Sequence, residues 1–300
     1  MPRWLKASVA CVALAVLAIG VDWAELPGHL AQLDWRLAAL ALLVVVLELP
    51  VNAAKWWWSL RLHDLNFRWW YLLRTGCIAY FLNNFLPSAI GGDVYRIYKT
   101  MSGGEKAGAV SAVLVERIVG LGAMLGYGAF AAIFLAQEYV AARVYLWIAA
   151  GGACAALLVL LALRVMRRSS LVHIVHRSTW LEPIAKNLER ILRPRREWLA
   201  LGVYSLLFQS LAGAVVWLAF LAVGADVRIA QAMLITAAAG VASILPISIS
   251  GLGVVEGAIA GAAVALGVDY DAAVLAALAV RILVTPVSAA CGIFLVTSRQ

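Results

Sequence analysis

Four long runs without a charged residue set the strongest limit on the fold of this chain. They cover Ile118–Gln137, Val144–Leu163, Trp198–Ala225 and Ile229–Val255. A helix needs roughly 20 apolar residues to cross the hydrocarbon core of a bilayer. Charged residues make up 13% of the 300 residues, whereas soluble domains contain about 25%. The sequence therefore predicts an all-α polytopic membrane protein, with residues 1–300 forming a single transmembrane domain.

The spacing of apolar runs and charges predicts about six full spans. We expect them over residues 5–21, 37–54, 107–137, 144–163, 198–223 and 272–296. Arg3 and Lys6 lie at the start of the first span, which we interpret as a retained helix with these two residues on the inner side. Residues 164–196 hold nine Lys or Arg against two acids. Basic loops stay on the cytoplasmic side, so we expect 164–197 to be a cytoplasmic amphipathic segment and both termini to be cytoplasmic.

Two similar stretches interrupt the apolar pattern, NFLPSAIGGDVYR at 84–96 and ILPISISGLGVVE at 244–256. Aligning Pro87 with Pro246 places Gly92 on Gly251. Proline and glycine break helices, and broken helices at corresponding positions of opposite orientation are typical of secondary transporters. The pattern favours two re-entrant helical hairpins in an inverted repeat, the first at 35–137 and the second at 198–297. The alternative is two unrelated proline kinks.

Arginines inside the predicted spans are the first candidates for a binding site. Arg117 and Arg281 each fall near the middle of the bilayer, where charges mark functional sites or structural ion pairs. Glu116 points about 100° away from Arg117 on a helix, so the two should find different partners. Asp93 and Arg96 share one side of the helix that follows the glycines. Arginine beside a helix N-terminus suits an anion, in particular a phosphate.

Enzyme signatures are missing from the sequence. It contains no Walker motif, GxSxG or HExxH, and no nucleic-acid-binding motif accompanies its basic residues. All four cysteines lie in apolar segments without CxxC spacing. We therefore expect no catalysis, no metal and no cofactor.

The stretches FLNNFLPSAIGGDVYRIYKT, AVLVERIVGLGAM and LPISISGLGVVEGA resemble the transmembrane region of lysylphosphatidylglycerol synthetase/flippases over about residues 35–297. The resemblance implies a lipid translocator of the bacterial inner membrane. The synthetases add a soluble aminoacyl-transferase domain that is not in this sequence, so the expected role is to move or bind a lipid made elsewhere. Residues matching the family's core positions give the expected substrate-binding set Asn84, Asp93, Arg96, Glu116, Arg117, Ser248, Glu256 and Arg281, and the helix-break set Pro87, Gly91, Gly92, Pro246, Gly251 and Gly253.

Together these features favour a lipid flippase that moves an anionic or glycosylated phospholipid or a polyprenyl-phosphate lipid. One alternative is a non-transporting membrane partner of a lipid-modifying or cell-envelope enzyme, with 164–197 as its contact. A small-anion channel would also suit the arginines. The sequence leaves open which lipid is moved, in which direction, with which coupling ion, and whether the protein forms a homo-oligomer.

Overall fold

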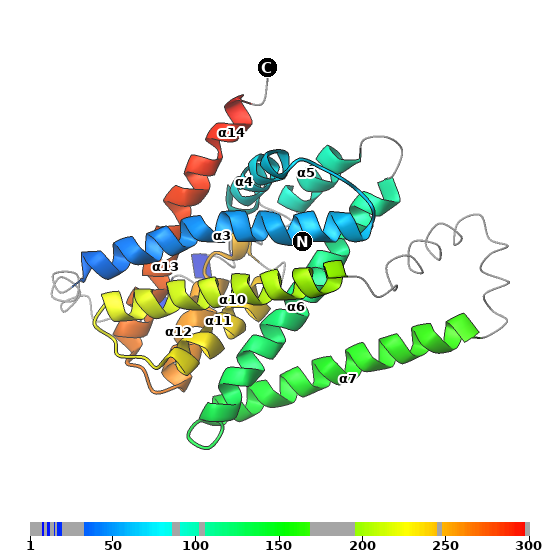
Figure 1. Cartoon of the computed structure of the whole chain (residues 1–300). Coiled ribbons are helices and arrows are strands. Elements are labelled where there is room, and N and C mark those ends of the chain that lie inside the picture. The colour runs from blue at the N-terminus through cyan, green and yellow to red at the C-terminus, as the bar shows by residue number, and fades with distance from the viewer. Residues whose placement is uncertain are drawn as a thin grey trace.

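The computed structural model describes residues 33–85, 91–101, 106–168, 196–244 and 248–297, together with a few isolated positions before them. The regular elements in these ranges are helices (Figure 1). In chain order they are α3 (Trp35–Leu62), α4 (Trp69–Phe85), α5 (Gly91–Thr100), α6 (Lys106–Leu135), α7 (Val140–Arg168), α10 (Arg196–Ala222), α11 (Ile229–Ile244), the 3-10 turn η1 (Ile249–Gly251), α12 (Val254–Ala265), α13 (Tyr270–Cys291) and α14 (Ile293–Val296).

Five stretches of helix are long and apolar enough to cross a bilayer. They are Trp35–Leu62, Ala107–Leu135, Val140–Leu158, Arg196–Ala222 and Tyr270–Val296. The prediction of an all-α polytopic membrane protein is confirmed, and these five helices coincide with five of the six expected spans. Of the sixth, at 5–21, the structure describes seven positions, and these are helical. Most of the expected segment 164–197 and the prolines Pro87 and Pro246 fall outside the described residues.

The most extensive helix packing in the described residues is between α3 and α10, which lie side by side (Figure 1). Asp34 begins α3 by accepting hydrogen bonds from the backbone N–H groups of Arg36 and Leu37, at 2.8 and 3.3 Å. Such an N-cap satisfies donors that have no partner within the helix. The Asp34 N–H in turn donates to the carbonyl of Ala222, 2.9 Å away at the end of α10. The two helices therefore run antiparallel.

The main hydrophobic core lies where α6, α10, α11, α12 and α13 meet. Its largest fully buried side chains include Leu135, Phe220, Ile235 and Ile259. Small residues let helices approach closely in membrane proteins. At Gly240 of α11, an added Cβ would overlap the thioether of Met124 on α6. The two helices therefore approach closely here, and both Gly240 and Met124 line the cavity described below.

Two pairs of short helices complete the fold. The helices of the first pair, α4 and α5, have 17 and 10 residues, and those of the second, α11 and α12, have 16 and 12. The members of each pair pack against each other. At 1.5 Å per residue each short helix falls below the roughly 30 Å of a hydrocarbon core. Since the members of each pair pack against each other, the chain changes direction between Phe85 and Gly91 and again between Ile244 and Val254.

Candidate functional site

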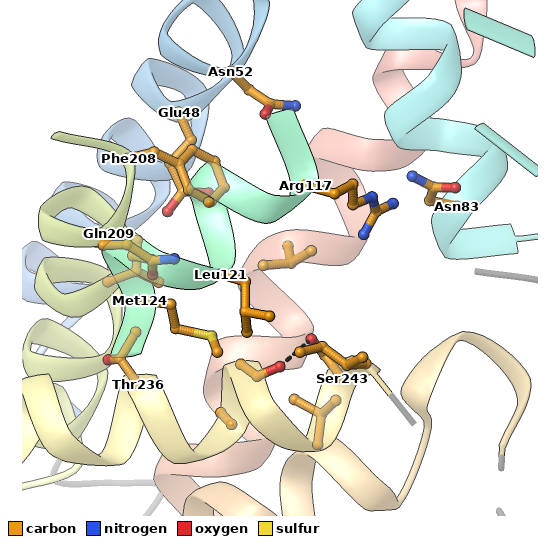
Figure 2. Close-up of a pocket in the computed structure, with 18 of the residues that line it drawn as sticks. Glu48, Asn52, Asn83, Arg117, Leu121, Met124, Phe208, Gln209, Thr236 and Ser243 are labelled. Carbon is orange, nitrogen blue, oxygen red and sulfur yellow. Dashed lines mark hydrogen bonds between the residues drawn. The ribbon is translucent and has the colours of Figure 1, made fainter. Parts of the chain in front are cut away.

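A cavity of about 500 Å³ lies among the helices of both halves of the chain (Figure 2). Most of its lining comes from α3, α6, α10 and α11, with further residues from α4, α5, α12 and α13. One region of the wall carries charged side chains. The remainder is largely apolar, with Leu121, Met124 and Phe208 among its residues. A pocket of this size with a few convergent polar groups is the usual form of a small-molecule site.

Arg96 of α5 is the centre of the charged region. Its guanidinium donates a short hydrogen bond to the Glu116 carboxylate and lies 3.5 Å from Oδ1 of Asp93. The same group sits over the Trp56 ring, 4.4 Å from the ring centroid. Arg96 is only 7% exposed. A buried charge is tolerated when it is paired and hydrogen-bonded, and these contacts supply both conditions.

The pairing continues on both sides of Arg96 and forms a chain of alternating charge. Arg117 donates to Oδ2 of Asp93 through Nε, at 2.9 Å, and through a terminal nitrogen. Oε1 of Glu116 lies 3.8 Å from Nζ of Lys55. The order is Lys55, Glu116, Arg96, Asp93, Arg117, and we call this set the charge chain. Glu116 and Arg117 find different partners, as their positions on the helix predict.

The charge chain has one open end. The side chain of Arg117 is 56% exposed, whereas those of Arg96, Glu116 and Lys55 are between 5 and 9% exposed. Figure 2 shows the Arg117 guanidinium facing Asn83 across the cavity. Nε of Arg96 and Oδ1 of Asp93 are buried without a hydrogen-bond partner. Unsatisfied buried groups of this kind are costly: Nε of Arg96 needs an acceptor such as a phosphate oxygen, and Oδ1 of Asp93 needs a donor such as a hydroxyl.

The first helix break determines where Asp93 lies. The Gly92 N–H donates to Oδ1 of Asn83 at 2.8 Å, which joins the start of α5 to α4. A Cβ at Gly92 would lie 2.6 Å from the same oxygen and would overlap the Ala79 carbonyl. Glycine is therefore required for this close approach. Asp93 follows in the first turn of α5, where the helix dipole stabilises a carboxylate.

The second helix break repeats this arrangement in a buried form. Glu256, like Asp93, is the third residue of its helix. It accepts a 2.7 Å hydrogen bond from the Gly253 N–H and an ion-paired bond from Nε of Arg281. Gly251 and Gly253 have φ values of 72° and 78°, the left-handed region that favours glycine. Glu256 and Arg281 are not among the described residues that line the cavity.

The structure thus brings together four of the eight expected binding residues, namely Asp93, Arg96, Glu116 and Arg117, and pairs two others elsewhere. Asn84 donates to the Tyr80 carbonyl of its own helix at 3.0 Å, and its neighbour Asn83 lines the cavity instead. Ser248 is buried and its hydroxyl has no hydrogen-bond partner among the described residues.

Three polar cavity residues of α3 were missed from the sequence, namely Glu48, Asn52 and Lys55. In the sequence Lys55 precedes Trp56, Trp57 and Trp58, and such a cluster is typical of the aromatic belt at a membrane interface. Glu48 falls within a predicted span, where an acid is itself a sign of function. In the described part of the chain its carboxylate makes no hydrogen bond or ion pair. Gln209 of α10 adds an amide to the same cavity (Figure 2).

Comparison with known proteins gives one finding. A family model described as "Lysylphosphatidylglycerol synthase TM region" matches residues 3–292, which is nearly the whole chain. A search of curated proteins finds no match. The matched range contains both helix breaks and every residue of the charge chain.

Proposed function

This chain belongs to the lysylphosphatidylglycerol synthase TM region family, and we propose that it is a lipid flippase that holds a phosphate-bearing head group in the charged cavity. The lipid would be an anionic or glycosylated phospholipid or a polyprenyl-phosphate lipid, moved across the bacterial inner membrane. The acyl chains would stay in the bilayer while the head group passes through the protein. Such a function requires no covalent step, so we also propose that the chain is not an enzyme.

The observation that carries this proposal is the charge chain within an apolar helical bundle. Charges inside a membrane are expensive and are usually retained for function. The charge chain has three cations, Lys55, Arg96 and Arg117, and two anions, so it bears one formal positive charge in excess, while Glu48 adds a third acid elsewhere in the cavity lining. Its exposed end is a guanidinium, whose planar donors suit phosphate oxygens. A phosphate could therefore bind Arg117 in place of, or beside, Asp93.

The two helix breaks support a transport cycle. We propose that α4–α5 and α11–α12 are re-entrant hairpins of an inverted repeat, and that the basic segment 164–197 and both termini are cytoplasmic. In such proteins one repeat rocks against the other around a site near the midplane. In the first repeat, exchange of Arg117 between Asp93 and the lipid phosphate would couple head-group binding to this motion.

Lipid mass spectrometry on the purified protein tests this function directly. We expect one phosphate-bearing lipid class to be enriched over the membrane bulk, and Arg117→Ala to lose it. A hydrogen bond to a charged group is worth about 1.5–3 kcal/mol, which corresponds to a loss of tenfold or more. Arg143→Ala is the matched control, because Arg143 is an exposed arginine of α7 that lines neither cavity.

Transfer of a fluorescent phospholipid between the leaflets of reconstituted vesicles supplies the functional readout. Wild type and Arg143→Ala should transfer it at equal rates, and Arg117→Ala should not. Unchanged enrichment and unchanged transfer in a folded Arg117→Ala protein would reject the proposal.

A further inference from the structure

A second cavity, of about 510 Å³, lies between α6 and α7. Twelve described residues line it, six from each helix, and all of them are Gly, Ala, Leu or Ile. We call it the α6–α7 groove, and its wall is formed by residues 118–129 of α6 and 146–156 of α7. The two helices meet at the turn before Val140, and α7 then diverges from the other helices (Figure 1). A wholly apolar wall favours an apolar occupant.

Two of the three glycines of the groove do not serve close helix packing; the third, Gly152, lies close to Leu125, which a Cβ would meet at 3.1 Å. In membrane proteins glycines at a helix interface normally bring backbones together. Gly128 does so, since a Cβ there would meet Tyr145 and Ala237 at about 2.5 Å. At Gly122 and Gly126, by contrast, an added Cβ would find no atom within 4 Å. These two glycines leave space open where packing would have closed it.

The groove adjoins the charged cavity at one residue of α6. Leu121 lines both of them, and Ile118, at one end of the groove, follows Arg117 directly in the chain. One helix therefore presents the exposed guanidinium to the first cavity and an apolar channel to the second. A ligand that extends from one to the other must be charged at one end and apolar at the other.

The length of the groove agrees with one leaflet of a bilayer. From Ile118 to Ala129 the helix rises roughly 16 Å at 1.5 Å per residue. Half of a hydrocarbon core of about 30 Å is about 15 Å. The groove therefore runs from about the depth of Arg117, which the sequence places near the midplane, to the edge of the hydrocarbon core, and an acyl chain lying in it would stay within the hydrocarbon.

We infer that the α6–α7 groove binds one acyl chain of the same lipid whose phosphate binds at Arg117. This inference rests on the proposed function, because the phosphate is what selects the lipid that enters the groove. The groove would then be a second binding site, which holds the lipid tail while the head group occupies the charged cavity. A lipid held at both ends would enter and leave the site in one orientation.

The open glycines provide a sharp test. Gly126→Leu would fill the groove, and its Cβ meets no atom within 4 Å. Gly202→Leu on α10 is the matched control, since Gly202 has equally open surroundings and lines neither cavity. Gly122→Leu is a second blocking variant, which guards against misfolding of the first. Thermal unfolding of all three proteins checks that they are folded.

The probe is phosphatidic acid with a photoreactive diazirine on one acyl chain, present in phosphatidylcholine vesicles that contain the full chain. Phosphatidic acid offers the phosphate and the tails without a further head group. After illumination, peptide mass spectrometry should find adducts on residues 118–129 and 146–156 in wild type and Gly202→Leu. Both groove-filling variants should lose these adducts by about tenfold, the equivalent of two methylene groups no longer buried.

The Arg117→Ala variant separates the tail site from ordinary bilayer contact. Loss of groove adducts in this variant supports the inference, since the head group then no longer holds the lipid. Equal labelling of the groove in Arg117→Ala would show that any bilayer lipid fills it, and would overturn the inference. A further outcome is that phosphatidic acid binds only when Arg117 is present, but its adducts lie outside the α6–α7 groove. That result would overturn the inference about the groove and leave the proposed function in place. Binding that is independent of Arg117 throughout would reject both.

Discussion

The two helix breaks contain the same kind of acid–arginine pair, but the arginine is more exposed in the first break than in the second. In each, the third residue of the helix after the break is an acid that binds an arginine of the following long helix. The partners are 24 residues apart in the Asp93–Arg117 pair and 25 apart in the Glu256–Arg281 pair. Yet the Arg117 side chain is 56% exposed and that of Arg281 only 22%.

The difference in arginine exposure indicates that one ion pair belongs to a binding site and the other has a structural role. Asp93 shares its carboxylate between Arg96 and Arg117 and borders the cavity, so its pairing can be exchanged for a ligand. Glu256 is 2% exposed and is also held by the Gly253 N–H. A carboxylate satisfied in this way fixes the second break in one geometry. We therefore interpret the first pair as part of a binding site and the second as a structural tie between α12 and α13.

The largest effect on stability is expected at the structural tie. Arg281→Met leaves the Glu256 carboxylate buried without its counter-ion, and breaking a buried pair from one side costs about 3–5 kcal/mol. We expect a large fall in the thermal unfolding midpoint of the detergent-solubilised protein. The double variant Glu256→Gln, Arg281→Met removes both charges and should recover much of the loss. A double variant as unstable as the single one would contradict the assignment of a simple ion-pair tie.

The next effect concerns the exchangeable pair. Asp93→Asn removes an acid that competes with the ligand for Arg117, and raises the excess positive charge of the charge chain. We expect a bound phosphate lipid to be held more tightly, by up to about tenfold for 1.4 kcal/mol, while transfer between leaflets slows. Quantitative lipid mass spectrometry and the vesicle transfer assay measure the two quantities. Loss of lipid binding as severe as in Arg117→Ala would instead make Asp93 a residue that positions Arg117.

A third effect tests the close approach at the first break. Gly92→Ala places a methyl group against Asn83 and the Ala79 carbonyl, and overpacking of this kind costs about 1–3 kcal/mol. The thermal midpoint should fall. Gly122→Ala is the control, since its Cβ would meet nothing within 4 Å and alanine is favoured over glycine in a helix. Equal stability of the two variants would show that α5 can move away from α4 at little cost.

The sequence alone predicted the membrane class, five of the spans and the charged residues of the first break. Apolar runs and charges within them can be identified from the order of residues, without the fold. The sequence pattern aligns the two breaks through Gly92 and Gly251, which leaves Asp93 opposite Leu252. The structure makes Glu256 the counterpart of Asp93, since the second break contains the additional turn η1 before α12.

The misplaced cavity residues show a different limit. Asn83 and Asn84 are adjacent, and only the position of α5 decides which of them faces the cavity. Lys55 was missed as a cavity residue because its partner Glu116 is 61 positions away in the sequence. Nothing local to Lys55 distinguishes a buried cation from one at the membrane interface. Pairing across helices depends on tertiary packing, which periodicity does not encode.

The smallest effect is expected at a third acid–arginine pair, in which the acid and the arginine are each 51% exposed. At the turn after α6, Glu138 accepts two hydrogen bonds from Arg228, at 3.1 and 2.7 Å. The hydrogen bonds from Arg228 lower the pKa of Glu138 below its ordinary value of 4.5. A lowered pKa means that the pair stabilises the fold above pH 4.5 and that this contribution is lost as the pH falls through the lowered pKa.

Glu138→Gln should therefore change the thermal midpoint only slightly near neutral pH, since exposed ion pairs contribute little. The gap between wild type and variant should close as the pH falls below 4.5. Thermal unfolding across an acidic pH series measures this gap, with Glu256→Gln as the buried reference. If Glu138→Gln were as destabilising as Glu256→Gln, burial would not be what separates the structural tie from the exposed pair, and the distinction between the two breaks would lose its physical basis.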